Sequence, residues 1–495
     1  MQRHIIHKQK VSLRVSKRED VHFFQSRVSE MLQNELNGEV ESLLDELFPS
    51  DKIIRIDLLQ LDLGDLNQQN FDQEFKNEFI KALAKSLSSK KDDLDISNNS
   101  EVLSKARSLV NSFIYFLEKG YLPLYSAVEK TVDWENDLLN NLTANEYTYF
   151  LDWLRDNYQH NPVITERLIL QFSDTLLAKL LSVDAPAISE SWIQVYKDYA
   201  YLVKNYLKGE YSSRIEIWKY LFYVLLNNKD ELWAFRVLKL LADYFGIKGS
   251  SITIVKEDDI NRQLKTAIVK DAFNELTEFL KARNGNETNK WKRVGNNAEA
   301  QFDALYDNGK ELTSGWSRGE KKKWEAEEEE GLYVNNCGIV ILHFFLRPFF
   351  EDLKLVTEGK FPNEKNQQRA VLLLHYLATG EVEVAEFDLA LQKILCGYPL
   401  ENTLPTRITL TPKEKTETKK LLNTVIDYWE PLKGTSIEGL RDTFLHRNGK
   451  LIKNDSGWQL IVEQKTVDIL LGKIPWGFST ILLPWMDQIL NVDWY

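Results

Sequence analysis

The stretch KLIKNDSGWQLIV, residues 450–462, predicts a β-hairpin near the carboxyl end of the chain. Two short apolar runs, KLI and WQLIV, flank four polar or turn-forming residues, Asn454, Asp455, Ser456 and Gly457. Apolar runs of this length around a turn of about four residues are typical of consecutive antiparallel strands. The carboxyl-terminal part of the chain is therefore predicted to contain a sheet as well as helices.

The residues around this hairpin extend the prediction to a domain of mixed α and β structure. Apolar residues recur at helical spacing over residues 340–350 and again over 370–377. After the hairpin, residues 466–471 predict a short helix and residues 480–483 an apolar strand. We therefore expect residues 331–495 to form a C-terminal α+β domain whose end is rich in tryptophan and proline.

The middle of the chain is predicted to be helical. Wide apolar stripes recur at helical spacing over residues 101–284, and Pro, Gly, Asn and Asp signals separate them about every 15 to 25 residues. This pattern predicts packed antiparallel helices, and it excludes a coiled-coil rod because no heptad pattern persists. Residues 285–330 are rich in Asn, Gly, Lys and Glu, which predicts a charged flexible spacer.

The amino-terminal end predicts a second, smaller α+β region. Val11, Leu13 and Val15 alternate with polar residues, which predicts a half-buried strand, and residues 21–32 continue as a helix. Residues 53–64 (IIRIDLLQLDLG) change their apolar phase midway. A β-bulge would keep all these aliphatic side chains on one face of the strand.

Two apolar stripes at helical spacing, residues 40–47 and 71–87, flank that strand. Residues 88–100 contain turn formers and charges with almost no bulky apolar side chain, so we expect a linker there. Residues 1–88 are thus predicted to form an N-terminal α+β domain. The whole chain is predicted to be mainly α, with small α+β units at both ends and several domains.

Length, composition and charge agree with this organisation. At about 150 residues per domain, 495 residues suggest about three domains, and 43% hydrophobic with 27% charged residues is ordinary globular usage. Extensive disorder is therefore excluded. The formal net charge of −12 would repel phosphate backbones and anionic lipid, so nucleic acid is not an expected partner.

Cysteine usage and apolar segments predict a cytoplasmic protein. Cys337 and Cys396 have no disulfide or metal-type spacing, so we expect two reduced, buried thiols. The amino terminus lacks the apolar segment of a signal peptide. The longest apolar stretch, residues 338–346, is interrupted by His343 and followed by Arg347, so no stable membrane insertion is expected.

No arrangement of side chains in the sequence predicts catalysis. His4 and His7 have no further ligand at metal-binding spacing, and Asp57 and Asp62 are read as solvated positions on a strand edge rather than as an acid/base pair. The acidic run EAEEEE, residues 325–330, lacks the glycine turn of a calcium loop. The sequence therefore predicts no enzyme, no metal and no cofactor.

The most unusual local feature is the spacing of tryptophan and proline in the last twenty or so residues, in the strings PWGF, LLPWM and VDWY. These side chains either fill a compact core or form a rigid anchor surface for a protein partner, and both can hold for different residues. The candidate partner-binding residues are Pro475, Trp476, Pro484, Trp485, Met486 and Trp494.

Several separated strings together resemble the tape measure family of contractile injection systems, which are phage-tail-like particles. The amino-terminal strings are HIIHKQ (4–9), LLDELFP (43–49), IRIDLLQLDLG (54–64) and FLEKGYLPLYS (116–126), where Leu124 and Tyr125 replace a tryptophan pair of the family. The carboxyl-terminal strings are VNNCGIVILHFFL (334–346), RAVLLLHYLATG (369–380), LQKILCGYPL (391–400), WEPLKGTSIEGLRDTFLHRNGKL (429–451) and GWQLIVEQKTVDILLGKIPWGFSTILLPWM (457–486).

The resemblance implies a structural assembly protein that is made in the cytoplasm and incorporated with the inner tube and baseplate, where its length sets the tube length. Its implied partners are inner tube, spike or baseplate proteins, bound by the two ends of the chain. The unmatched middle of about 200 residues would reach ~300 Å as one helix at ~1.5 Å per residue. Acting as such a ruler would require the packed helices to open into a line.

A second hypothesis is a compact adaptor or assembly chaperone that binds tube, spike or cargo through the carboxyl-terminal tryptophan surface. A third hypothesis is an injected enzyme. No nucleophile, base and oxyanion donor at recognisable spacing in the sequence supports it. In-frame deletions within residues 128–284 separate the first two: a ruler predicts proportionally shorter tubes, and an adaptor predicts unchanged ones.

Overall fold

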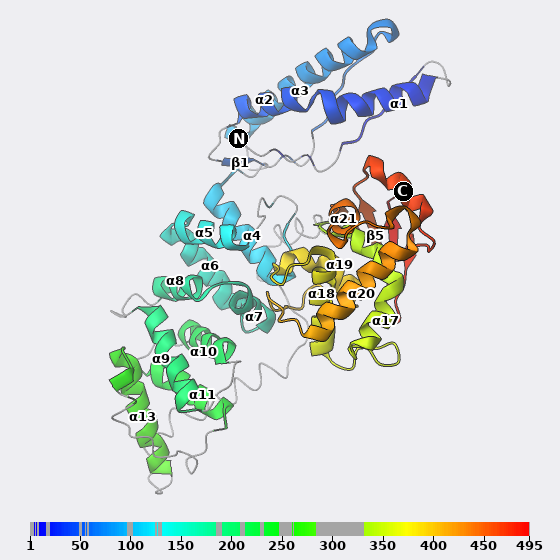
Figure 1. Ribbon diagram of the computed structural model, residues 1–495. Coiled ribbons are helices and arrows are strands. Elements are labelled where there is room, and N and C mark those ends of the chain that lie inside the picture. Colours follow the sequence, from blue (N-terminus) through cyan, green and yellow to red (C-terminus); the bar gives the residue numbers. More distant parts are fainter. Residues whose placement is uncertain are drawn as a thin grey trace. The chain divides into compact units, whose positions relative to one another are not determined.

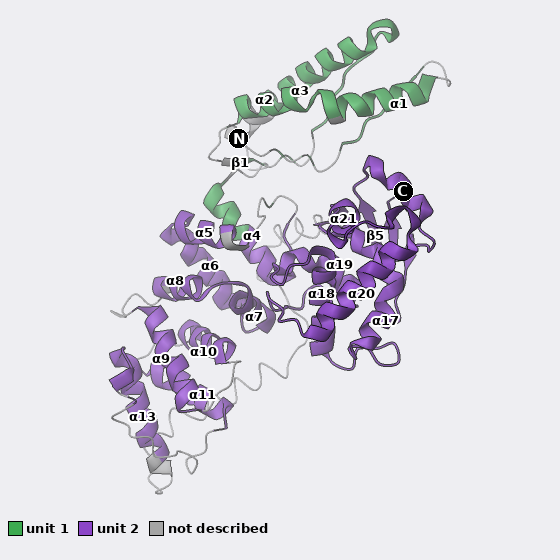
Figure 2. Ribbon diagram, viewed as in Figure 1, with its two compact units in different colours: residues 1–111, 125–127 green, residues 112–124, 128–495 purple. Residues whose placement is uncertain are grey.

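The structure is a computed structural model that describes residues 4, 6, 9–15, 20–48, 52–54, 56, 59–96, 102–123, 126, 131–184, 191–207, 213–227, 232–246, 260, 262–283 and 331–494. The predicted spacer, residues 285–330, lies outside the described residues. The chain divides into two compact units (Figure 2). Unit 1 comprises residues 1–111 and 125–127, and unit 2 comprises residues 112–124 and 128–495.

Among its described residues, unit 1 contains helices α1 to α3, the first part of α4 (Lys105–Lys119) and a two-stranded sheet (Figure 1). The first three helices are α1 (Val21–Glu30), which continues through the π-helical turn Met31–Glu35, α2 (Asn37–Leu47) and α3 (Phe71–Ile96). Strand β1 (Lys52–Ile54) pairs antiparallel with β2 (Val102–Ser104). The centre of the core consists of Val28, Met31, Leu36 and Phe75. The helices predicted over residues 21–32, 40–47 and 71–87 are thereby confirmed.

Two extended segments predicted in unit 1 are wrong. Residues 9–15 form no strand, and Val11 and Leu13 are 47% and 39% exposed. In the predicted bulged strand, β1 ends at Ile54, and the described residues 59–64 form no strand either. There the Asp62 carboxylate accepts a hydrogen bond from the Gly64 amide at 3.0 Å, which is a turn contact.

The linker predicted to begin at residue 88 is also wrong in its first half, because α3 continues to Ile96. Lysine and aspartate are tolerated in helices, so the polar composition of residues 90–95 does not by itself indicate a loop. Strand β2 follows a few residues later.

The helical middle is confirmed as a stack of helices in unit 2 (Figure 1). It begins with the end of α4 (Lys105–Lys119), and the later helices are α5 (Thr131–Asn141), α6 (Ala144–Asn157), α7 (Pro162–Gln171), α8 (Asp174–Asp184), α9 (Trp192–Asn205), α10 (Ser213–Asn227), α11 (Trp233–Tyr244) and α13 (Ala267–Arg283). Helix α8 packs against α5, α6 and α9, and α10 packs against α7, α9 and α11. Each helix therefore contacts its near neighbours in sequence.

A five-stranded sheet lies at the carboxyl end of unit 2. Its order is β3-β4-β5-β7-β6, and the strands are β3 (Leu332–Val334), β4 (Gly449–Asn454), β5 (Gly457–Val462), β6 (Thr480–Ile481) and β7 (Ile489–Asp493). All neighbours are antiparallel except β5 and β7. The predicted fold class, mainly helical with small α+β units, is confirmed.

The predicted hairpin is β4–β5, with a turn tighter than expected. Asn454 pairs with Gly457, so only Asp455 and Ser456 lie between the strands. The glycine is required because its φ is 135° and a Cβ there would lie 2.3 Å from the carbonyl oxygen of Ile489 on β7. Gly457 thus ends the turn and also lets the parallel strand approach.

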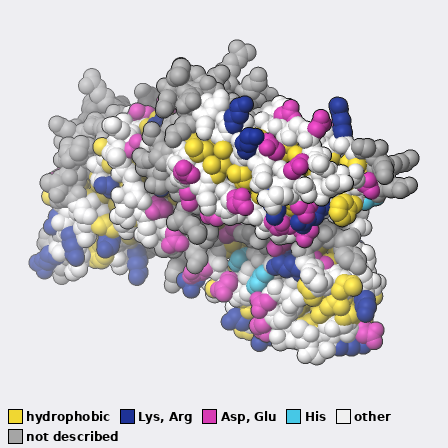
Figure 3. Space-filling model, turned by 90° about the horizontal axis from the view of Figure 1, so that it is seen from above, with side chains coloured by type: hydrophobic (Ala, Val, Ile, Leu, Met, Phe, Trp, Pro, Cys, Tyr) yellow, Lys and Arg dark blue, Asp and Glu magenta, His cyan; other side chains and the backbone are white. Residues whose placement is uncertain are grey.

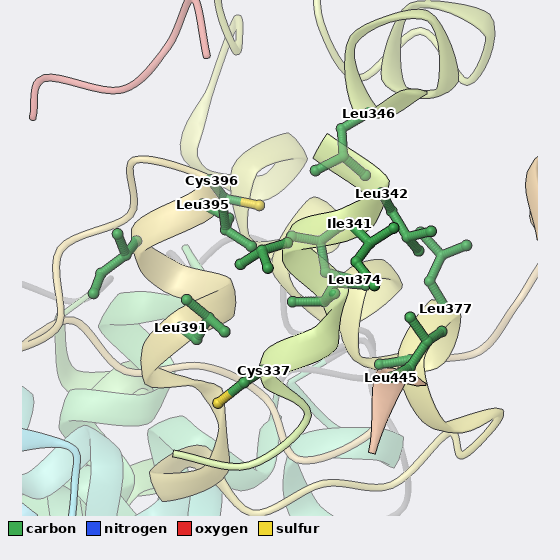
Figure 4. Packing of buried hydrophobic residues seen from close by; sticks show 14 of the residues in the cluster. Cys337, Ile341, Leu342, Leu346, Leu374, Leu377, Leu391, Leu395, Cys396 and Leu445 are labelled. Carbon is green, nitrogen blue, oxygen red and sulfur yellow. The ribbon is translucent and has the colours of Figure 1, made fainter. Parts of the chain in front are cut away.

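The helices of this region cover one continuous core. They are η4 (Cys337–Leu342), α17 (His343–Asp352), α18 (Glu364–Thr379), η5 (Glu386–Leu389), α19 (Ala390–Leu395), α20 (Pro412–Tyr428), η6 (Glu430–Leu432), α21 (Ile437–Leu440), η7 (Arg441–Leu445) and η8 (Thr466–Lys473). In Figure 4, Leu374 of α18 lies near Ile341 of η4 and Leu395 of α19, and Leu377 of α18 lies near Leu445 of η7.

Both cysteines lie in this core (Figure 4). Cys337 and Cys396 are free and fully buried, which confirms the predicted thiols. Burial raises the pKa of both thiols well above the ordinary cysteine value, so they stay protonated at neutral pH. In the part of the chain that the structure describes, no helix combines the length and apolar character needed to cross a bilayer.

Candidate protein-interaction site

The six predicted partner-binding residues occupy three different places in the C-terminal region. Trp476 lies at the surface beside α17, and Trp485 lies against the end of α19. Trp494 is the last described residue. It is 1% exposed and belongs to the core. Pro475 and Pro484 are exposed. Each tryptophan therefore has its own environment.

Trp476 is held at the surface by one hydrogen bond and two aromatic neighbours. Its Nε1 donates to the carbonyl oxygen of Ile341 at 2.9 Å. Its ring meets Phe345 edge to face at a centroid distance of 5.0 Å and stacks on Phe344 at 6.5 Å. The bonded indole has a fixed orientation, and its ring joins the aromatic face of α17.

A tyrosine from α20 extends this group of rings. The centroids of Tyr428 and Phe345 lie 6.4 Å apart. Phe344 is 63% exposed and Tyr428 is 66% exposed, although both are large aromatic side chains. We call Phe344, Phe345, Tyr428 and Trp476 the aromatic ridge. Exposed aromatic groups that touch one another are typical of protein-binding surfaces.

The sequence prediction found Trp476 in the ridge and missed the other three rings. A usable signal was present in α17. Helical spacing places Leu346, Phe349 and Phe350 on the buried face, which leaves Phe344 directed outward. Figure 3 displays hydrophobic side chains gathered in patches among acidic and basic groups on the face that it presents.

Trp485 contributes mainly to packing. Its Nε1 donates to the carbonyl oxygen of Leu395 at 2.8 Å, and its ring lies 5.6 Å from Phe350 and 5.2 Å from Phe361. The backbone of Gly397 approaches it closely, since a Cβ on that glycine would lie 2.3 Å from the Trp485 carbonyl oxygen. Trp485 thus closes the core over the end of α19.

Met486 and Trp494 are core residues. Met486 is 8% exposed. The Trp494 Nε1 donates to Asp468 Oδ2 at 3.1 Å, and the other Asp468 oxygen accepts from Arg447 Nη2 at 2.7 Å. One buried carboxylate therefore accepts from both an indole and a guanidinium in the interior. Partner binding by the six predicted residues stays a prediction, and exposure favours it at Pro475 and Pro484, while Trp476 is half-buried.

The other candidate residues are dispersed. The His4 Nε2 lies 2.8 Å from Asp45 Oδ1 in unit 1, and Asp62 accepts its turn hydrogen bond. His7, Asp57 and the acidic run 325–330 lie outside the described residues. Within the described ranges, no group of three or more His, Cys, Asp and Glu side chains is placed to hold a metal ion.

One comparison with known proteins identifies a family. The family model described as contractile injection system tape measure protein matches residues 3–494, which is nearly the whole chain. Searches of curated proteins and of solved structures returned no match. The match includes the helical middle, for which the sequence strings gave no resemblance.

Proposed function

Because the chain belongs to the contractile injection system tape measure protein family, and so has a structural role in such a system, we propose that it assembles with the inner tube and baseplate and limits the length of the tube. The observation that supports this most directly is the extent of the family match, residues 3–494 of 495. The role needs no catalysis, and assembly would begin in the cytoplasm.

The aromatic ridge is the proposed docking surface for another particle subunit. Exposed aromatic side chains bring large contact area and lose little conformational freedom on binding. Here that freedom is already restricted, because the Trp476 indole is hydrogen bonded to Ile341 and packed on Phe345. An apolar patch on a tube or baseplate subunit would complement this surface.

Removal of the chain tests the proposed function. Particles should be assembled in cells that lack it and examined by electron microscopy. We expect few particles, or inner tubes of irregular length, and recovery of uniform tubes when the chain is supplied again. Normal yield with uniform tubes in its absence would contradict the proposal.

Truncation of the ridge tests the docking surface. Phe344→Ala combined with Tyr428→Ala should weaken incorporation into particles by on the order of 30-fold, the effect of losing one strong interface anchor. The folded state should persist because both side chains are largely exposed. Ile469→Ala, which removes an apolar side chain that is 67% exposed and lies outside the ridge, serves as the control. Equal incorporation of the two variants would reject the ridge.

A further inference from the structure

Three charged side chains from distant parts of the chain meet in the interior of unit 2. Arg167 comes from α7, Glu386 from η5 and Lys393 from α19, and each is at most 1% exposed. The Arg167 Nε donates to both Glu386 carboxylate oxygens at 3.2 Å, and Lys393 Nζ donates to Glu386 Oε1 at 2.7 Å. We call these three residues the clasp.

The remaining polar atoms of the clasp are also bonded. The Arg167 guanidinium donates to the carbonyl oxygens of Leu117 and Glu401. Lys393 Nζ donates to those of Leu400 and Asn402 at 2.9 and 2.7 Å, so all three ammonium donors are used. The clasp therefore joins the end of α4, helix α7 and the loop that follows α19.

Further contacts run alongside the clasp. Gln171 of α7 donates to the carbonyl oxygen of Leu404 at 2.6 Å and accepts from the Glu386 amide at 3.2 Å. The Phe387 ring lies 5.9 Å from Phe116 of α4 and 6.1 Å from Trp134 of α5. Polar and apolar contacts together attach the first helices of the middle to the C-terminal region.

This attachment determines whether residues 185–330 can add to the distance that the chain spans. The attached helices end with α8 at Asp184. The chain next joins the C-terminal region at Leu332 of β3, which pairs with β4. Helix α8 itself packs on α5 and α6. Residues 185–330 therefore begin and end in the same compact unit. A segment whose two ends are held in one body adds nothing to the separation of other points.

We propose that the clasp joins helices α5–α8 and the end of α4 with residues 331–494 into a single docking head, and that the length of residues 185–330 does not enter the distance that limits the tube. This inference rests on the proposed function. It differs from the expectation drawn from the resemblance, in which the extent of the middle sets the tube length.

An insertion in the full-length chain tests the inference. About 80 residues of a helical repeat are inserted between residues 285 and 286, which would add ~120 Å to a linear ruler at ~1.5 Å per residue. Electron microscopy should give tubes of the wild-type length. Tubes that lengthen with the insertion would overturn the inference and support the proposed function. Normal tubes in the complete absence of the chain would instead reject the proposed function itself.

A second measurement examines the clasp without particle assembly. A protease site within residues 285–330 allows the purified chain to be cut after folding, and the two fragments should co-elute in gel filtration. Glu386→Gln should weaken their association by on the order of 100-fold, since two buried cations lose their carboxylate. Arg167→Met, on the other fragment, should have the same effect, which distinguishes weakened association from misfolding of either fragment.

Asp468→Asn is the matched control, because it removes the carboxylate of the buried Arg447 pair, whose two members lie in the same fragment. It should leave the association of the cut chain unchanged. Separation of the wild-type fragments, or equal association of the Glu386 and Asp468 variants, would overturn the clasp.

Discussion

At the scale of single residues, Gly397 has the clearest steric constraint beside a predicted site residue. Its φ is 60°, and a Cβ there would lie 2.3 Å from the carbonyl oxygen of Trp485. Gly397→Ala should therefore lower the free energy of unfolding by about 2 to 3 kcal/mol, through left-handed backbone strain and displacement of the Trp485 loop. Urea unfolding measures this change.

The matched substitution is Gly477→Ala in the neighbouring PWGF string. Beyond its two chain neighbours, no described residue has an atom within 4 Å of a Cβ built at Gly477. The unfolding free energy of the Gly477→Ala variant should stay within about 0.5 kcal/mol of that of the wild-type protein. Equal urea midpoints for the Gly397→Ala and Gly477→Ala variants would contradict the prediction, because they would show that the Trp485 loop moves away from the new methyl group at no cost in stability.

His375 makes the stability of the C-terminal region sensitive to acid. Burial lowers the pKa of His375 to about 4 in the folded protein. The unfolded chain takes up this proton near pH 6.5, so the folded state loses stability as pH falls from about 6.5 to 4. Between pH 7.5 and 4.5, wild type should lose about 2 to 3 kcal/mol more unfolding free energy than His375→Gln. Parallel losses in the two proteins would contradict this.

Residue-level prediction from sequence succeeded where a single residue type carried the signal. The burial of both cysteines followed from their ordinary behaviour, whereas partner binding by Trp476 stays a prediction. The clasp was missed because Arg167 and Glu386 are 219 positions apart. The local sequence of an amphipathic helix does not show whether an arginine on it is buried or solvated. Burial of Arg167 depends on its contact with Glu386, which is distant in the sequence.

At the scale of elements, the capping of α20 explains why that helix begins where it does. The Thr411 hydroxyl and amide both donate to Glu414, and Glu414 Oε2 also accepts from Arg369 Nη2 at 2.6 Å. Pro412 at the first helical position needs no amide partner. This combination of Thr, Pro and Glu is a sequence signature of a helix start.

Thr411→Ala should lower the unfolding free energy by about 1 kcal/mol, because it removes the cap and one partner of Glu414. Thr416→Ala is the control, since that hydroxyl donates only to the Pro412 carbonyl oxygen at 3.0 Å within the same helix. Thermal unfolding followed by circular dichroism compares the two variants. A control as unstable as Thr411→Ala would rule out the cap as the cause.

Helices and the hairpin were predictable because their patterns are local, whereas isolated strands were not. The apolar runs of β4 and β5 are joined by their own turn, so each supplies the other's backbone partner. Alternation over residues 11–15 gave the same local signal but no partner strand, and those residues remain irregular. An alternating pattern describes one face of a strand and says nothing about which strand will pair with it.

At the scale of the whole chain, the clasp sets the free energy needed to extend the middle. Removing one partner of a buried ion pair costs about 3 to 5 kcal/mol, and truncating a buried large aromatic side chain costs a similar amount. Phe116, Trp134 and Phe387 all pack at this junction. The combined free-energy cost of breaking the ion pair and these aromatic contacts is comparable to the whole stability of a typical domain, about 5 to 15 kcal/mol. Separating α4–α8 from the C-terminal region is therefore close to unfolding it.

Calorimetry gives this junction a thermodynamic test. In wild type the clasp couples α5–α8 to residues 331–494, so unit 2 should melt in one main transition. Arg167→Met removes the one member of the clasp that lies outside residues 331–494 and leaves Glu386 paired with Lys393, so its cost of about 3 to 5 kcal/mol falls mainly on the junction. The helices and the C-terminal region should then melt in two separate transitions. Asp468→Asn imposes a similar cost within the C-terminal region, where both partners of its ion pair lie, so its single transition should only move to lower temperature. Two transitions in both variants, or one in both, would mean that the clasp is not what couples the two parts.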